Sequence, residues 1–235
     1  MTAPLAATGL ALPGRLEPTD LLVDAPSLVC LVGPNGSGKT SLLHALAGIG
    51  APSSTVRIGG VDCGGAAPAE RRRLLAFLPA SREAAWPVTV RDLVALGLPA
   101  GAAAAEADWA IAALALEEFA NRRIDQLSTG ERSRALIARA LAPKPRLLLL
   151  DEPVANLDPL WQLRLMDLLK RTVAAGQTVL IALHDLDLAA RYADRLIVMN
   201  ARRIVADGEP RALIEGDAIR SVFGIQMGKD GWQPV

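Results

Sequence analysis

The sequence predicts an α/β protein whose central sheet is mostly parallel. Three observations predict this class: short apolar runs alternate with segments of helical length, a glycine-rich turn joins one run to a helix, and an Ala/Leu-rich stretch interrupts the alternation. The fully apolar runs lie at residues 28–32, 147–150, 179–183 and 196–199. Such runs are typical of strands buried on both faces, and strands of this kind belong to parallel sheets.

The first apolar run, residues 28–32, is expected to be a strand that feeds a helix at residues 39–48. Further short strands are expected at 56–58 and 76–78, because glycines follow the first and a proline follows the second. The later apolar runs are separated by segments long enough for helices. This alternation predicts parallel strand connections.

The Ala/Leu-rich stretch from about residue 88 to 141 is expected to form a helical lobe inserted into the α/β domain. Within it, Trp109, Ile111 and Leu114 recur at helical spacing, which favours a packed helix over a low-complexity segment. The length suits one large domain with such a lobe. We therefore expect a single domain over residues 1–235.

Composition excludes several classes of protein. Lys plus Arg equal Asp plus Glu at 25 each, so no positive field favours nucleic acid, and the arginines at 71–73 are expected on a solvated helix face. Cys30 and Cys63 lack the spacing of a disulfide framework or zinc site, and Cys30 is expected in a buried strand. No apolar run approaches the ~20 residues that cross a bilayer, and no secretion signal is evident, so we expect a cytoplasmic protein.

A phosphate-binding loop is predicted between the first apolar strand and its helix. The segment matches G-x-x-x-x-G-K-[ST] and consists of Gly33, Pro34, Asn35, Gly36, Ser37, Gly38, Lys39 and Thr40. Its glycines let backbone N–H groups face a triphosphate, and the helix N-terminus adds partial positive charge. Lys39 is expected to reach the β and γ phosphates of that triphosphate, and Thr40 to offer its hydroxyl to Mg²⁺. A glycine turn with a purely structural role does not explain the Lys-Thr pair.

Two adjacent carboxylates follow the apolar run at 147–150. Asp151 is expected in the metal shell, and Glu152 is expected to take a proton from an attacking water. Acids at the end of a strand are weak evidence alone. Their interpretation as catalytic groups depends on the phosphate loop upstream.

The segment Leu127-Ser128-Thr129-Gly130-Glu131 resembles the signature of the ABC ATPase family, usually written LSGGE, and departs from it at Thr129. The resemblance covers nearly the whole chain. It implies a P-loop NTPase fold with an antiparallel β portion and an inserted helical subdomain. It also implies that Ser128, Gly130 and Glu131 face the ATP held by a second copy in a head-to-tail homodimer. An N-cap Ser with Glu131 in a capping box is an alternative that is compatible with this role.

Two shorter segments follow in the order that the family shows. Asn156-Leu157-Asp158 resembles the loop that crosses between subunits, so Asp158 is assigned to the nucleotide site. Leu183-His184-Asp185 resembles the switch histidine, which implies that His184 contacts the γ-phosphate and helps hold the water and Glu152. The other histidine, His44, is expected to pack or to face solvent.

The sequence departs from the family pattern in two places. Ala80 stands where a Gln usually contacts Mg²⁺ or the attacking water, so either a residue among 81–83 substitutes for it or water completes the shell. No Phe, Trp or Tyr precedes Phe77, although the family commonly stacks adenine on an upstream aromatic. The guanidinium of Arg15 is a candidate replacement, and an ordinary surface Arg is the alternative.

The C-terminal segment, residues 193–225, is similar to ATPase subunits of importers for iron-siderophore, haem or vitamin B12. This resemblance implies integral membrane permease subunits as partners, indirectly a substrate-binding protein, and a peripheral location at the cytoplasmic face of the membrane. The groove near residues 80–87 would receive the permease, with Trp86 and Val88 as contact candidates. The alternatives are a soluble ABC ATPase without a membrane partner and, less favoured, a P-loop kinase or GTPase, which lack the signature segment.

Overall fold

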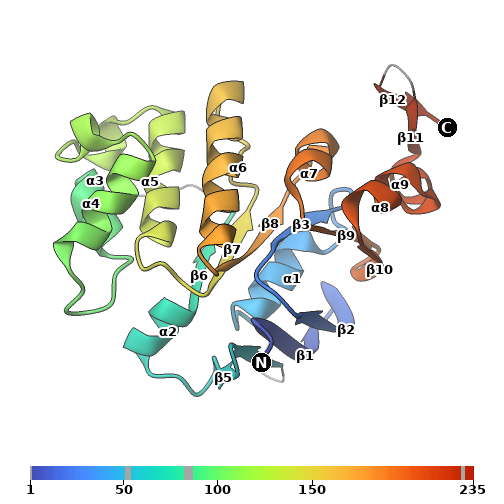
Figure 1. Cartoon of the computed structure of the whole chain (residues 1–235), viewed down its shortest axis with the longest axis horizontal. Coiled ribbons are helices and arrows are strands. Elements are labelled where there is room, and N and C mark those ends of the chain that lie inside the picture. Colours follow the sequence, from blue (N-terminus) through green and yellow to red (C-terminus); the bar gives the residue numbers. More distant parts are fainter. Residues whose placement is uncertain (1, 51–53, 82–86, 229–230) are drawn as a thin grey trace.

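The central sheet of the computed structural model is mostly parallel, as predicted. The structure describes residues 2–50, 54–81, 87–228 and 231–235. Its six-stranded sheet has the order β10-β9-β3-β8-β7-β6, and only the β9–β10 pair is antiparallel (Figure 1). The strands are β3 (Leu28–Val32), β6 (Leu75–Leu78), β7 (Leu147–Asp151), β8 (Thr178–Ala182), β9 (Arg195–Asn200) and β10 (Arg203–Gly208).

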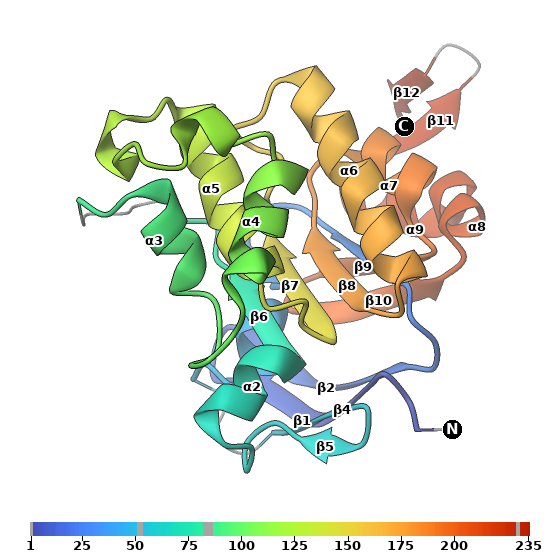
Figure 2. The same ribbon diagram turned by 60° about the vertical axis from the view of Figure 1, so that its left-hand side comes forward.

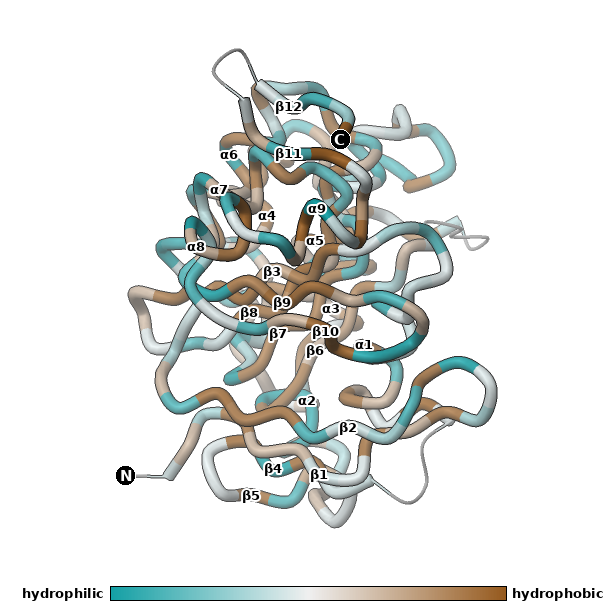
Figure 3. Tube along the Cα trace, turned by 90° about the vertical axis from the view of Figure 1, so that its right-hand side faces the viewer, coloured by the Kyte–Doolittle hydropathy of each residue, from teal (hydrophilic) through white to brown (hydrophobic). Residues whose placement is uncertain are grey.

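The sheet is covered on both faces, which explains why its strands are apolar throughout. Every residue of β3, β7 and β8 is buried, and Figure 3 shows these strands as brown segments in the middle of the molecule. Val29 and Leu31 pack with helix α1 (Lys39–Leu46) and the N-terminal strands, whereas Leu28 and Cys30 pack on the opposite side. Burial raises the pKa of the Cys30 thiol to about 12, so this cysteine is a core residue, as expected.

A four-stranded antiparallel sheet lies against α1, in agreement with the antiparallel portion that the family resemblance implies. Its order is β2-β1-β4-β5, and its strands are β1 (Leu5–Leu12), β2 (Leu16–Val23), β4 (Thr55–Ile58) and β5 (Val61–Asp62). Helix α2 (Pro68–Leu74) then leads into β6. The sequence predicted β4 but neither β1 nor β2.

Three helices between β6 and β7 pack on one another at the β6 end of the sheet (Figure 2). They are α3 (Val90–Ala95), α4 (Ala104–Ala113) and α5 (Thr129–Leu141), with 3-10 turns at Glu117–Phe119 and Ile124–Gln126. Ile111 and Leu114 are buried, and Trp109 lies at the surface beneath the Lys144 ammonium, 4.9 Å from the ring centre. The division of the chain into one domain with a lobe at 88–141 stays a prediction.

The remaining helices lie on the face of the sheet opposite α1, where they pack against β3, β8, β9 and β10, and a C-terminal hairpin extends beyond them. They are α6 (Pro159–Ala174), α7 (Leu186–Tyr192), α8 (Pro210–Glu215), α9 (Asp217–Phe223), β11 (Ile225–Gly228) and β12 (Gly231–Pro234). Strands β11 and β12 form a hairpin, and Trp232 Nε1 donates a hydrogen bond of 2.9 Å to Asp187 of α7. Within the described ranges, no helix combines the length and the apolar character that a bilayer crossing requires.

Candidate nucleotide-binding site

The phosphate loop connects β3 to α1 and has the backbone geometry that its glycines permit. Gly36 and Gly38 are left-handed, with φ of 76° and 105°. A Cβ atom on Gly33 would lie 2.3 Å from the Met199 carbonyl oxygen, so no side chain fits where the loop passes β9. The loop therefore forms a cradle of backbone atoms at the N-terminus of α1, as anion binding requires.

Lys39 lies inside this cradle. Its side chain is buried, and Nζ donates to the carbonyl oxygens of Gly33 at 2.6 Å and Pro34 at 3.3 Å. Burial lowers the pKa of Lys39, and the nearby carboxylates of Glu152 and Asp151 oppose that shift. The ammonium group is thus positioned at the loop, where a phosphate can replace carbonyl oxygens as its partner.

Thr40 and Asp151 are brought together by α1 and β7. Asp151 is fully buried at the carboxyl end of β7. Burial raises the pKa of its carboxyl group, and a hydrogen bond with the Thr40 side chain opposes the rise. A hydroxyl and a carboxylate in contact are oxygen ligands of the kind that Mg²⁺ prefers, so these two residues fit the predicted metal site.

Glu152 and His184 meet at the ends of two neighbouring strands. Glu152 follows β7 and His184 follows β8, and His184 Nε2 lies 2.5 Å from Glu152 Oε1. Glu152 has φ of 51°, an uncommon backbone conformation for a non-glycine residue, which costs on the order of 1–3 kcal/mol. The sharp turn directs the chain away from the strand directly after Asp151. The histidine is in a position to orient the carboxylate.

A cavity of about 520 Å³ opens beside the phosphate loop. Its lining residues come from several parts of the chain and are Gly14, Arg15, Asn35, Gly36, Ser37, Gly38, Lys39, Thr40, Ser41, Glu152 and Arg202. Arg15 lines the cavity, as the adenine hypothesis requires, although its stacking role stays a prediction. Arg202 was missed by sequence reasoning, because it reaches the cavity from the turn between β9 and β10.

The signature residues lie outside this cavity, at the N-terminus of α5. Ser128 Oγ accepts from the Glu131 amide at 3.3 Å, and the Ser128 amide donates to Glu131 Oε2 at 2.9 Å. This is the predicted capping box, and the hydrogen bond from the Ser128 amide lowers the pKa of Glu131. A Cβ atom on Gly130 would lie 3.4 Å from the Asn156 carbonyl oxygen, so the signature segment abuts the loop that ends at Asp158. In one chain the two segments meet each other and not the phosphate loop.

Asp158 has a structural role that the sequence did not predict. Its carboxylate accepts from the Trp161 amide at 2.9 Å and caps α6. Behind it, Arg134 of α5 lies 4.1 Å from the centre of the Trp161 ring and donates to the carbonyl oxygens of Leu114 and Ala115. The ring contact joins α5 to α6, and the two hydrogen bonds join α5 to the segment that follows α4.

Ala80 and Ser81 are exposed just after β6. Arg82 and Glu83, the other candidates to replace the absent Gln, and Trp86, the predicted permease contact, lie outside the described residues. Val88 is partly buried and packs against the core, in agreement with its alternative interpretation as a packing residue.

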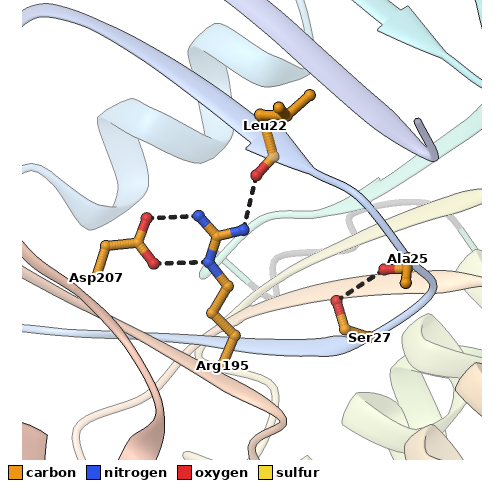
Figure 4. A network of polar contacts seen from close by, with 5 residues as sticks. All are labelled: Leu22, Ala25, Ser27, Arg195 and Asp207. Atoms are coloured by element: carbon orange, nitrogen blue, oxygen red, sulfur yellow. Dashed lines mark hydrogen bonds and ion pairs between the residues drawn. The ribbon is translucent and has the colours of Figure 1, made fainter. Parts of the chain in front are cut away.

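The turns that carry Arg15 and Arg202 are held together by β2. The Glu17 amide donates to the Arg202 carbonyl oxygen at 2.9 Å, and the Arg202 amide donates to the Ser37 carbonyl oxygen at 3.0 Å. At the other end of β2, Arg195 binds Asp207 through two hydrogen bonds of 2.6 Å and the Leu22 carbonyl oxygen at 2.7 Å (Figure 4). Hydrogen bonds to both ends of β2 therefore link the Arg15 turn to the β9–β10 hairpin.

Comparison with known proteins agrees with the geometry of the site. A family model described as ABC transporter matches residues 16–155. The chain is 40% identical over 234 residues to the hemin import ATP-binding protein HmuV of Rhodopseudomonas palustris, covering 94% of this chain and 87% of that protein. It is 38% identical over 209 residues to the cobalamin import ATP-binding protein BtuD of Halobacterium salinarum, covering 85% of this chain and 52% of that protein.

Solved structures are similar in fold over almost the whole chain. An ATP-binding subunit of an ABC transporter has a TM-score of 0.77 and 26% identity, over 94% of this chain and 93% of that chain. A dimeric ATP-binding cassette in a post-hydrolysis state, bound to ADP and Pi, has a TM-score of 0.77 and 25% identity, over 88% and 99% of the two chains. The chain belongs to the ABC transporter family and is an ATPase of that family.

Proposed function

We propose that this ATPase powers import through an ABC transporter, and that the transported molecule is haem or cobalamin. The observation that carries the proposal is that Lys39, Thr40 and Glu152 line one cavity. Asp151 contacts Thr40 there, and His184 contacts Glu152. The named functions of two similar proteins, hemin import and cobalamin import, support the substrate class.

In the proposed reaction, water attacks the γ-phosphate of ATP, and ADP and phosphate leave. Glu152 accepts the proton of the attacking water, and the contact of 2.5 Å with His184 orients its carboxylate. Lys39 and the loop amides hold the phosphates, so that positioning and charge stabilisation supply most of the catalysis. Thr40 and Asp151 would hold Mg²⁺, whose positive charge offsets the negative charge of the phosphates.

We propose that two copies pair head to tail. Ser128, Gly130 and Glu131 then face the ATP of the other copy, and Asp158 lies at the same junction. Two observations support this arrangement: these residues lie apart from the phosphate cavity of their own chain, and a similar cassette has been solved as a dimer. Closure on ATP and reopening after hydrolysis would then drive the transporter.

The proposed location is the cytoplasmic face of the membrane, beneath permease subunits that receive a solute from a binding protein. A hollow of about 280 Å³ supports a docking place near the predicted groove, since Phe77, Pro79, Ser81, Leu96 and Arg139 are among its lining residues. Leu96 is half exposed there, which suits contact with an apolar helix.

The test joins hydrolysis to uptake. The purified chain is expected to release phosphate from ATP, and Lys39→Ala to abolish that release, whereas Glu215→Gln on α8 should leave it unchanged. Coexpressed with a haem or cobalamin permease, the wild-type chain should copurify with it and support uptake in vesicles. ATP hydrolysis without capture by either permease would contradict the importer proposal and leave a soluble ABC ATPase.

A further inference from the structure

The turn between β9 and β10 has an unusual sequence for its geometry. Asn200 and Arg203 face each other across the hairpin, so Ala201 and Arg202 form a two-residue turn. Both residues are left-handed, with φ of 46° and 67°. Turns of this kind strongly favour Asn-Gly, because both positions require positive φ. A side chain as large as arginine is therefore held in a conformation that glycine adopts more easily.

In the part of the chain that the structure describes, no structural contact explains the side chain of Arg202. Among the described residues, no ion pair or side-chain hydrogen bond involves Arg202, and the same holds for Arg15. Both arginines are exposed, and both line the cavity beside the phosphate loop. With Lys39 they give the lining three cations against the single carboxylate of Glu152. This balance suits a polyanion with a planar group.

The order of strands tells which end of ATP lies near Arg202. Glu152 and His184 follow β7 and β8, which lie on one side of β3, whereas Arg202 follows β9, on the other side. The phosphate loop follows β3, between the two groups. Because the γ-phosphate must lie at Glu152, the triphosphate extends along the loop and the nucleoside lies on the β9 side.

Arg15 and Arg202 flank the same part of the loop on that side. A Cβ atom on Gly38 would lie 3.1 Å from the Arg202 Cα and 3.5 Å from the Arg15 carbonyl oxygen. The Glu17 and Arg195 hydrogen bonds keep both turns in place. No aromatic residue lines the cavity among the described residues, so the guanidinium groups of Arg15 and Arg202 are the flat cationic groups that can stack on a base there.

We infer that Arg202 is a nucleotide-binding residue that stacks on the base of ATP and, with Arg15, holds the nucleoside end. This assignment rests on the proposed nucleotide site. The left-handed backbone at Arg202 then costs some conformational stability, and it is retained because the turn places a guanidinium group in the cavity.

The test compares ADP with pyrophosphate, which carries the phosphates of ADP without the nucleoside. Arg202→Ala is expected to weaken ADP binding in calorimetry about three- to tenfold, and to leave pyrophosphate competition unchanged. Equal weakening of both ligands would overturn the contact with the base. Unchanged ADP binding would overturn the assignment altogether.

A matched pair of glycine variants separates binding from folding. Arg202→Gly and Ala201→Gly relieve the same kind of left-handed backbone, so each should raise Tm by about 2–4 °C. Only Arg202→Gly should weaken ADP binding. Equal ADP binding by the two variants would overturn the inference. If the wild type binds ADP and Lys39→Ala does not, the phosphate-loop site is intact. If the wild type does not bind ADP at all, both the proposed nucleotide site and this inference are refuted.

Discussion

The phosphate-loop cavity and the signature segment are both built at the N-terminus of a helix, yet their polar groups find partners differently. In the cavity, Thr40 contacts Asp151 and His184 contacts Glu152, so residues from three elements already meet in one chain. At the signature segment, the Ser128 side chain and the Glu131 carboxylate complete a capping box within one helix end. The cavity is thus assembled within one chain, whereas the signature segment is a capped helix end whose proposed nucleotide role requires a second copy.

The largest expected effect comes from the cavity. Glu152→Gln removes the proposed proton acceptor and preserves the size of the side chain, so kcat should fall about 10²- to 10⁴-fold. Because hydrolysis is blocked, ATP should convert the variant from monomer to dimer in size-exclusion chromatography. Glu215→Gln is the control. Near-normal phosphate release by Glu152→Gln would show that the proton has another acceptor.

A smaller effect is expected at the signature segment, where a substitution can separate the two roles of Ser128. Asp is also a good N-cap, so Ser128→Asp should unfold in urea like the wild type. Its charge would lie against the γ-phosphate of the other copy, which should reduce kcat and ATP-dependent dimerisation more than about tenfold. Ser128→Asn is the neutral control with the same capping ability. If the Asp variant dimerised normally with ATP, Ser128 would have only its capping role.

The segment after β6 should give a modest gain. Ala80→Gln supplies an amide that can bind the metal shell or the attacking water, and one added hydrogen bond corresponds to a rate increase of about two- to tenfold. Steady-state ATPase assays over a range of Mg²⁺ concentrations would measure it. Ala80→Asn, whose amide is one methylene shorter, is the control. Identical kinetics for the wild type and the Ala80→Gln variant would mean that the position lies too far from the site.

The smallest effect concerns the capping box. The pKa of Glu131 is lowered in the folded state, so its carboxylate stabilises the fold at pH above its ordinary value of 4.5. That contribution is lost as pH falls through the lower, folded pKa. Glu131→Gln should therefore unfold about 0.5–1 kcal/mol more easily at pH 7, and the difference from wild type should shrink at pH 3. Glu117→Gln, an exposed residue of the same region, serves as the control in urea titrations at both pH values. A difference that persisted at pH 3 would contradict the role of the charge.

The parts that sequence predicted well are those where pattern and local chemistry agree. The strand at 28–32 matched β3 residue for residue, because both faces are buried and the loop glycines end it sharply. The helix predicted at 39–48 ends at Leu46, and Gly48 is left-handed with φ of 71°. The capping box could be predicted from only four consecutive residues. These features depend on residues close together in the sequence, so they can be predicted without knowledge of the tertiary contacts.

Other parts depended on long-range contacts. Strands β1 and β2 were not predicted, because their pairing is irregular between Ala7 and Leu12, which breaks the alternation of buried and exposed residues. Arg202 was not predicted, because it reaches the cavity only through the packing of the β9–β10 turn against Gly38, which lies far away in sequence. The capping role of Asp158 was also missed, although the Pro that follows it at the first helical position was a visible signal.

The left-handed backbone of Glu152 has a consequence for any selection toward heat resistance. Glycine or asparagine would adopt φ of 51° with less strain, so a screen that rewards only thermal stability should favour losing the carboxylate at this position. If Glu152 is the proton acceptor that we propose, the variants recovered would be better folded and would have lost ATP hydrolysis. In this chain, thermal stability and ATP turnover place opposite demands on one backbone torsion, the φ angle of Glu152, next to the buried Asp151.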